Sequence, residues 1–307
     1  MPARALGLML GYGADQLWGD PRRLHPVAGL GTCAQCLERR TYRDSRVRGV
    51  AHVLVLAGGA TGLAYLAERS ARYPLARTAL TAAVTWAVLG GRSLEREAMA
   101  VHEFLDAGDI ERARVRVRNL VGRDTAALSP DEIARAVVES VAENTSDAVV
   151  GSLLWGAAAG VPGLVAHRVA NTLDAMIGHR NARYERFGWA AARLDDVLGL
   201  PASRMSGTLT VATGPDPVGA LRAWRRDARH HPSPNAGVAE ASFAGALGLK
   251  LGGVNIYYGN RREDRALMGD GRVPTPPDIP RAVRLARRVG VGAMLSAVAL
   301  CLAGRRR

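Results

Sequence analysis

Hydrophobic and polar residues fall into long separate blocks along this chain. Residues 49–67 form an uncharged run rich in Val, Leu, Ala and Gly, and residues 148–167 form a second uncharged run. Helices of this length can cross the roughly 30 Å hydrocarbon core of a bilayer. The second run contains Gly156, Gly160 and Pro162, so we expect it to be kinked or re-entrant.

Three shorter apolar runs cover residues 5–14, 78–91 and 289–304. The first has no small-residue cleavage site behind it, which indicates a retained anchor. A buried helix of a soluble protein explains the other two equally well. The pattern predicts an all-α fold, a polytopic helical membrane protein with about four to five membrane segments in one domain over residues 1–307. We expect it in the cytoplasmic membrane of the cell.

The charge of the chain is strongly positive, at +13, and Lys250 is the only lysine. Seven arginines lie in residues 20–48 and eight in residues 92–135, which favours a cytoplasmic position for these helical loops. The direction in which the later segments cross is left open. Nucleic acid, the inner membrane leaflet and phosphorylated metabolites all attract such a charge. Nucleic acid is the least favoured partner, because no nucleic-acid module is recognisable and aromatics are sparse.

A helix start is clearly marked at Ser129-Pro130-Asp131-Glu132, where a capping box predicts a helix running to about Thr145. Glu139, Glu143 and Asp147 follow at intervals of four and would share one face. Such a row is either solvated or neutralised by a cation. We favour a cation site with Glu143 and Asp147 as ligands.

Residues 171–196 are unusually dense in chemically active groups. Carboxylates and arginines together suit a phosphate compound with Mg²⁺, since Mg²⁺ takes oxygen ligands and Arg binds phosphate oxygens in pairs. A solvated polar loop beside a membrane is the alternative. The residues concerned are Asn171, Asp174, Arg180, Asn181, Arg183, Glu185, Arg186, Arg193, Asp195 and Asp196.

Two further stretches have turn character. His231-Pro232-Ser233-Pro234-Asn235 is a rigid turn that presents His231, Ser233 and Asn235. The glycine-rich run 245–253 can cradle phosphate, although the chain has no P-loop motif. The prolines concentrated in residues 272–280, four in all, predict a linker.

Several blocks together resemble the signature blocks of the CobD/CbiB family, in order and over nearly the whole chain. These are membrane cobalamin-biosynthesis proteins, the adenosylcobinamide-phosphate synthases. The blocks are Asp15 to Pro26, Glu143-Asn144-Thr145-Ser146-Asp147, Asn171-Thr172-Leu173-Asp174, Arg183-Tyr184 through Arg193-Leu194-Asp195-Asp196, and His231 to Gly237.

The resemblance implies ATP-dependent amide formation, with Mg²⁺ accompanying the nucleotide. A propionate side chain of the corrinoid adenosylcobyric acid would be joined to (R)-1-amino-2-propanol or its O-phosphate. Metal ligation and base catalysis are expected from Glu143, Asp147, Asp174, Asp195 and Asp196, the first three as Mg²⁺ ligands. Phosphate binding is expected from Arg183, Arg186 and Arg193. Corrin or oxyanion binding is expected from Asn144, Asn171, His231, Ser233 and Asn235.

Two other classes of function fit parts of the pattern. A transporter would also place an acid such as Asp15 beside kinked apolar segments. A non-catalytic corrinoid-binding scaffold for other cobalamin-pathway enzymes would keep the same membrane fold without turning over ATP. The resemblance favours the enzyme over both.

Overall fold

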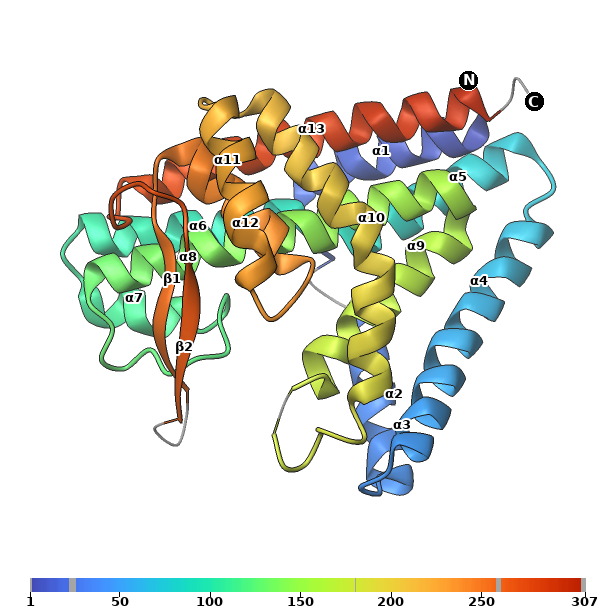
Figure 1. The fold of residues 1–307 in the computed structure, drawn as a ribbon. Coiled ribbons are helices and arrows are strands. Elements are labelled where there is room, and N and C mark those ends of the chain that lie inside the picture. Colours follow the sequence, from blue (N-terminus) through green and yellow to red (C-terminus); the bar gives the residue numbers. More distant parts are fainter. Residues whose placement is uncertain (1, 22–25, 180, 258–260, 305–307) are drawn as a thin grey trace. The chain divides into compact units, whose positions relative to one another are not determined.

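The computed structural model describes residues 2–21, 26–179, 181–257 and 261–304 (Figure 1). Residues 22–25 of the Asp15–Pro26 block and position 180 therefore lie outside the described part. The chain divides into two compact units, each built from separate segments. Unit 1 comprises Met1–Gly90, Asp147–Pro201 and Met294–Arg307, and unit 2 comprises Gly91–Ser146 and Ala202–Ala293. Helices dominate both units, as predicted.

Unit 1 contains helices at the predicted apolar runs together with helices that those runs did not predict, such as Pro26–Thr41 and Trp189–Thr213. Its elements are α1 (Ala3–Trp18), α2 (Pro26–Thr41), α3 (Arg46–Val53), the π-helical η1 (Leu54–Gly58), α4 (Gly59–Ser70), α5 (Pro74–Leu89), the π-helical η2 (Thr145–Gly151) and α9 (Ser152–Ile177), with the first part of α10 (Trp189–Thr213) and the end of α13 (Asp278–Ala303). A core around Phe187 packs residues of α2, α3 and α9 together.

Helices α1 and α5 lie side by side at unusually close range (Figure 1). Gly7 and Gly11 on α1 face Thr81 and Thr85 on α5, and a Cβ atom added at either glycine would lie 2.5 Å from the threonine Cβ. Small residues at such a contact let two helix backbones approach and increase their van der Waals packing. The apolar N-terminal run is thus a packed helix of unit 1.

Three helices in the described part of the chain are long and apolar enough to cross a membrane: Arg46–Ser70, Pro130–Ile177 and Asp278–Ala303. They contain three of the five predicted runs. On the first helix Leu54, Leu63 and Leu66 are exposed, a surface that suits lipid better than water. Helices α1 and α5 have 16 residues each, about 24 Å at 1.5 Å per residue, which is less than the hydrocarbon thickness. The fold is that of an all-α membrane protein.

The second long apolar run is kinked, as its glycines and proline predicted. Gly160 has a φ of 69°, which falls outside the helical range, and Pro162 follows inside the same helix. The left-handed conformation is easy only for glycine, and proline removes a helical hydrogen bond. Helix α9 is therefore bent within its apolar part.

Unit 2 contains α6 (Gly91–Asp106), α7 (Ile110–Val117), α8 (Pro130–Asn144), α11 (Pro217–Asp227), the 3-10 helix η3 (Ala228–His230), α12 (Ala236–Leu247) and the strands β1 (Leu251–Tyr257) and β2 (Arg261–Met268). It also includes the C-terminal part of α10 and the first part of α13. The predicted capping box begins α8, with Ser129 and Glu132 bonded reciprocally. Strands β1 and β2 pair antiparallel. This hairpin was not predicted.

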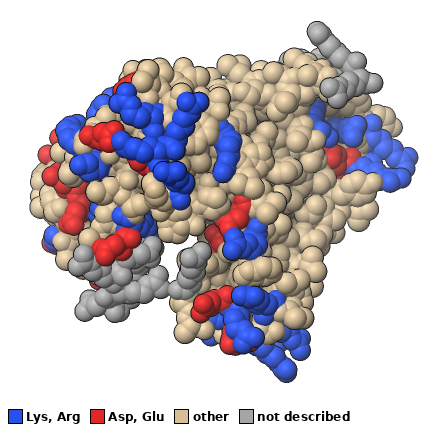
Figure 2. Space-filling model, viewed as in Figure 1, with Lys and Arg blue, Asp and Glu red and all other residues tan. Residues whose placement is uncertain are grey.

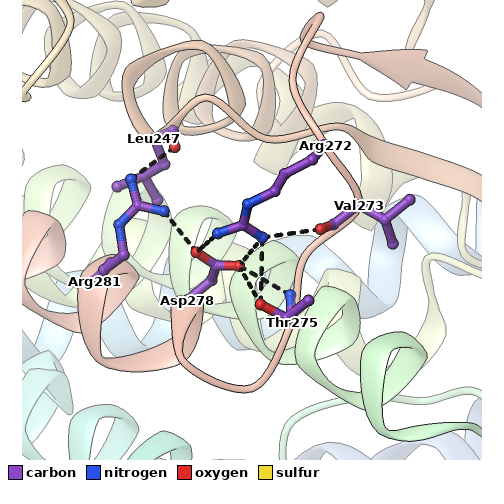
Figure 3. A network of polar contacts seen from close by, with 6 residues as sticks. All are labelled: Leu247, Arg272, Val273, Thr275, Asp278 and Arg281. Atoms are coloured by element: carbon purple, nitrogen blue, oxygen red, sulfur yellow. Dashed lines mark hydrogen bonds and ion pairs between the residues drawn. The ribbon is translucent and has the colours of Figure 1, made fainter.

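The proline-rich stretch 272–280 is firmly attached, contrary to the linker prediction. The buried carboxylate of Asp278 accepts hydrogen bonds from Nη1 and Nη2 of Arg272 at 2.6 and 2.8 Å, and from Nη1 of Arg281 at 2.6 Å. The N–H of Thr275 donates to the same group at 2.9 Å (Figure 3). A buried carboxylate is stable when its oxygens are satisfied in this way. The network fixes the beginning of α13 against the end of the hairpin.

Basic side chains gather on the surface over α11, as Figure 2 shows. Arg222, Arg225, Arg226 and Arg229 are exposed there. These arginines lie outside the two arginine-rich loops, residues 20–48 and 92–135, that the sequence analysis singled out.

Candidate functional site

An acidic pocket in unit 2 contains one of the predicted catalytic residues. Its volume is about 130 Å³, and α8, α12, β2 and residues 120–123 line it. We call it the acidic pocket; its polar and charged lining is Arg123, Glu139, Ser140, Glu143, Glu240 and Arg265. Three carboxylates and two guanidiniums thus share one small volume, which suits a small charged ligand.

Glu139 is neutralised from within the protein. Nη2 of Arg123 lies 3.1 Å from its Oε2, and both side chains are buried. The N–H of Gly252 donates to the other oxygen at 2.9 Å. Arg135, one helical turn earlier, donates to the carbonyl oxygens of Gly252 and Val254. The glycine-rich run therefore anchors the hairpin to α8 in the described structure, where the sequence had suggested a phosphate cradle.

The predicted row of carboxylates is interrupted before Asp147. Helix α8 ends at Asn144, and residues Thr145–Gly151 continue as π-helix. Because a π-helix bonds i to i+5, it shifts the register of the residues that follow. Glu143 lines the acidic pocket of unit 2, whereas Asp147 belongs to unit 1.

Glu240 is the most deeply buried carboxylate of the acidic pocket, with 1% of its surface exposed. Neither of its oxygens accepts a hydrogen bond from any residue that the structure describes. Nε2 of His231 lies 3.6 Å from Oε1. Burial, followed by the negative charges of Glu139 and Glu143, raises the pKa of Glu240 well above its ordinary value. This carboxylate lacks the internal partners that Glu139 has.

The turn before α12 places the imidazole of His231. Nδ1 of His231 lies 3.0 Å from the backbone nitrogen and 3.1 Å from the carbonyl oxygen of Ser233, and Nε2 is the ring nitrogen nearest Glu240. The hydroxyl of Ser233 accepts from the N–H groups of Asn235 and Ala236 at 3.2 Å each.

Asn235 is likewise engaged within the turn. Its Oδ1 accepts from the Ser203 hydroxyl and from Arg204, both at 3.0 Å. Ser233 and Asn235 therefore have structural contacts, and His231 is the member of the predicted set that borders the acidic pocket.

In unit 1 the predicted carboxylates Asp174 and Asp196 come together. Asp174 lies near the end of α9 and Asp196 in the first turns of α10, and their charges interact, with His179 also close to Asp174. Nη1 of Arg193 is 3.3 Å from Asp196, in an exposed pair. Asp195 precedes Asp196 and is half-buried. We call Asp174, Arg193, Asp195 and Asp196 the α9–α10 cluster.

Arg183 is held by an aromatic and acidic contact set. Its Nη2 donates to Oε1 of Glu38 at 2.9 Å, and the hydroxyl of Tyr184 donates to the same oxygen at 2.9 Å. The guanidinium also lies 4.3 Å from the ring centre of Tyr42, whose hydroxyl donates to the Arg183 carbonyl. These contacts fix the segment between α9 and α10 on α2, which is a positioning role.

Arg186 lines an open pocket together with a second arginine. A pocket of about 540 Å³ is lined by Ser45, Arg46, Val47, Glu185 and Arg186. Nη1 of Arg186 is 3.7 Å from Asp44, and both side chains are largely exposed. An exposed ion pair of this kind contributes only about 0 to 1 kcal/mol, so an anionic ligand can displace it.

The remaining predicted residues have separate surroundings. Asn144 donates to the carbonyl and hydroxyl oxygens of Ser140 at 2.9 and 3.1 Å. Asp147 interacts electrostatically with Arg168 of α9, as does Asp20. Asn171 is half-buried on α9, three residues before Asp174.

The predicted Mg²⁺ ligands Glu143, Asp147 and Asp174 are divided between the two units. Among the described residues, no group of three or more His, Cys, Asp or Glu side chains is arranged to hold a metal ion by itself. A Mg²⁺ ion usually keeps several waters and is shared with substrate phosphates, so one or two carboxylates are enough. Asp174 and Asp196 are two predicted carboxylates whose charges interact in the described structure.

Sequence reasoning missed Glu240, Arg123 and Arg265. The sequence does single out Glu240, because it is the only charged residue between His231 and Lys250. Burying a lone carboxylate in an apolar helix costs free energy unless the carboxylate has a partner. Arg123 and Arg265 come from distant parts of the chain, and only folding shows that they line the same pocket.

Comparison with known proteins gives one consistent result. The model of a family described as CobD/Cbib protein matches residues 8–286. A protein of Mycobacterium tuberculosis named Cobalamin biosynthesis protein CobD is 48% identical over 303 residues, covering 97% of this chain and 96% of the relative. A protein of the same name from Chromobacterium violaceum is 41% identical over 310 residues, covering 98% of both chains. No solved structure matches significantly.

Proposed function

Since this chain belongs to the CobD/CbiB family of cobalamin biosynthesis proteins, we propose that it is the synthase that closes an amide bond on the corrinoid. ATP drives the joining of (R)-1-amino-2-propanol, or its O-phosphate, to a propionate carboxylate of adenosylcobyric acid. The product is adenosylcobinamide or its phosphate. The observation that carries the proposal is the similarity to proteins named for cobalamin biosynthesis over nearly the whole chain.

The chemistry explains why ATP is needed. A carboxylate resists attack by an amine, so one of its oxygens first attacks the γ-phosphorus of ATP, and ADP leaves. The resulting acyl phosphate is then attacked by the amine, and phosphate leaves with one of the original carboxylate oxygens. Such phosphoryl transfer depends on positioning and on positive charge around the transferred group.

The α9–α10 cluster suits the Mg·ATP substrate. Asp174 and Asp196 offer oxygen ligands to the metal, with Asp195 beside them, while Arg193 and Arg186 offer guanidiniums to the phosphates. Both arginines are largely exposed and pair with carboxylates at 3.3 to 3.7 Å, and these weak pairs can be exchanged for phosphate contacts. Arg183 acts by holding the segment that carries Arg186.

The apolar helices fit a multi-pass protein of the cytoplasmic membrane, where other cobalamin-pathway enzymes would exchange corrinoids with it. The exposed leucines of Arg46–Ser70 support contact with lipid.

The proposal is tested with the purified full chain in lipid nanodiscs, supplied with adenosylcobyric acid, Mg·ATP and either amine. Chromatography with mass detection should find the amide, formed only when ATP is present. Comparing the two amines identifies the substrate. Corrinoid binding without product from either amine would overturn the proposal in favour of a non-catalytic scaffold.

A further inference from the structure

The acidic pocket has an unsatisfied carboxylate that the fold itself does not explain. Glu240 is almost completely buried and lines the pocket, yet no described residue donates a hydrogen bond to its oxygens. Buried polar groups in native proteins are nearly always hydrogen-bonded, and the exceptions require an explanation. A ligand that donates hydrogen bonds into the pocket is such an explanation.

The charged and titratable groups around Glu240 come from several elements. Glu139 and Glu143 face it from α8, Arg265 from β2, Arg123 from residues 120–123 and His231 from the preceding turn. Arg123 forms a buried ion pair with Glu139 at 3.1 Å. Among the described residues, Glu240 therefore lacks the buried guanidinium partner that Glu139 has.

The chemistry of the pocket selects a particular kind of ligand. An ionised carboxylate accepts hydrogen bonds and donates none, whereas an ammonium group has three donors and no acceptor. A cation beside Glu240 would also favour the ionised form that burial disfavours. A hydrogen bond between charged partners is about twice as strong as a neutral one. A primary ammonium would donate hydrogen bonds to Glu240 and would balance the excess of one carboxylate over the guanidiniums in the pocket lining.

The size of the pocket limits the rest of the ligand. Its volume is about 130 Å³, close to the roughly 150 Å³ of an engineered cavity that binds benzene. A whole corrin ring or nucleotide is too large for such a space. A short amino alcohol, which has fewer non-hydrogen atoms than benzene, can enter it.

We propose that the acidic pocket is the binding site for the ammonium group of the amine substrate, held by the carboxylates of Glu240 and Glu143. The inference rests on the proposed function for the identity of that amine. Arg265 also lines the pocket, so a phosphate at the other end of the same molecule would meet a counter-charge. (R)-1-amino-2-propanol and its O-phosphate both carry a primary ammonium on a short carbon chain. The test therefore measures the two amines separately.

The test measures binding of each amine to the purified full chain in nanodiscs by isothermal titration calorimetry, without ATP or corrinoid. Glu240→Gln keeps the shape of the side chain and removes its charge. We expect it to weaken binding of whichever amine is the substrate about tenfold or more, as loss of a charge-assisted hydrogen bond does. Glu103→Gln, at an exposed position of α6, should bind like the wild type.

Three further measurements make the result decisive. Isopropanol, which lacks the amine, should not bind, and Glu143→Gln should also weaken amine binding. In the synthase assay, Glu240→Gln should raise the KM for the amine at least as much while leaving the KM for ATP unchanged. A purely structural defect would lower the melting temperature and change both KM values, and would overturn the inference.

The results that would overturn the inference differ from those that would overturn the proposed function. Amide formation with an unchanged KM for the amine in Glu240→Gln overturns the inference and leaves the synthase proposal intact. Amine binding that depends on Glu240, with no amide formed under any condition, supports the pocket and overturns the synthase. Binding of Mg²⁺ alone that requires Glu240 and that the amine does not displace would overturn the inference by identifying a metal site.

Discussion

Arg123 and Glu139 form a buried ion pair whose members depend on each other. Their side chains are 4% and 9% exposed, and they lie 3.1 Å apart. Removing one partner from such a pair leaves an uncompensated buried charge, whereas replacing both with neutral side chains of similar volume costs far less.

We therefore predict that Arg123→Met destabilises the protein by about 3 to 5 kcal/mol. The double variant Arg123→Met with Glu139→Gln should recover a large part of that loss. Thermal unfolding of the wild type and both variants in one detergent measures these changes in stability. A double variant as unstable as the single one would show that the pair's charges do not explain the stability.

Asp227 gives the folded state a pH dependence. Burial alone would raise the pKa of its carboxyl group, but hydrogen bonds from Arg226 and from the Gly269 N–H hold the pKa below the ordinary value. A carboxyl whose pKa is lowered on folding stabilises the protein fully above its unfolded pKa, about 3.9. This stabilisation is lost as the pH falls through the folded pKa.

Asp227→Asn should accordingly lower the melting temperature at neutral pH. The gap between variant and wild type should shrink as the pH falls below about 4. Melting curves from pH 7 to pH 3 measure this difference. A gap that stays constant over the whole range would mean that Asp227 acts through packing, without its charge.

Asp174 tests the α9–α10 cluster. If it is a ligand of the metal in Mg·ATP, Asp174→Asn should reduce kcat by about a hundredfold or more, on the scale at which a positioned catalytic group contributes. Asp106→Asn, at an exposed position on α6, is the matched control and should retain activity. Full activity of Asp174→Asn would remove this residue from the mechanism.

At the scale of elements, the contact between α1 and α5 depends on two glycines. Gly11→Ala would place a Cβ atom 2.5 Å from the Thr85 Cβ and 2.6 Å from the Ala82 carbonyl oxygen. We predict a loss of about 1 to 3 kcal/mol from this overpacking. Gly13→Ala on the same helix meets no atom within 4 Å and should be neutral or slightly stabilising. Equal stability of the two variants would contradict the close packing.

Some elements were predictable because their signals are local. The capping box at Ser129 identified the beginning of α8, and the Gly160 and Pro162 pair identified the kink in α9. The hairpin was not visible in the sequence, since Gly252 and Gly253 read as a flexible run until their positive φ angles and the β1–β2 pairing place them in a bulge. The π-helix η2 likewise leaves no simple sequence pattern.

The candidate site was predictable only in part, because its contacts are long-range. The sequence analysis grouped Asp174 and Asp196 within residues 171–196. In the structure their charges interact, because both lie beside the connection between α9 and α10. The acidic pocket combines residues near positions 120, 140, 240 and 265, and no spacing rule connects them. Glu139 shares the predicted row of carboxylates with Glu143, but its ion pair with Arg123 became visible only in the structure.

At the scale of the whole molecule, the two units interleave along the chain. Unit 1 draws on three separate segments and unit 2 on two, so neither can be read as a continuous sequence block. The sequence pattern predicted one domain over residues 1–307 and gave no sign of this division. It did predict the apolar helices that make the chain a membrane protein, because that signal needs only composition and length.

Membrane insertion can be checked independently of activity. The full chain should stay in the membrane fraction after washing with alkaline carbonate or high salt, because the exposed leucines of Arg46–Ser70 need an apolar environment. Release by salt alone would mean that only the basic surface holds it to anionic lipid.

The most direct test of the synthase account follows the oxygen atoms of the substrate. Adenosylcobyric acid labelled with oxygen-18 in its free carboxylate is incubated with the purified chain, Mg·ATP and the amine, and the phosphate and corrinoid products are analysed by mass. The account predicts one labelled oxygen in inorganic phosphate for every amide formed, because phosphate leaves with a carboxylate oxygen. Unlabelled phosphate, or no amide from a protein that binds the corrinoid, would contradict it.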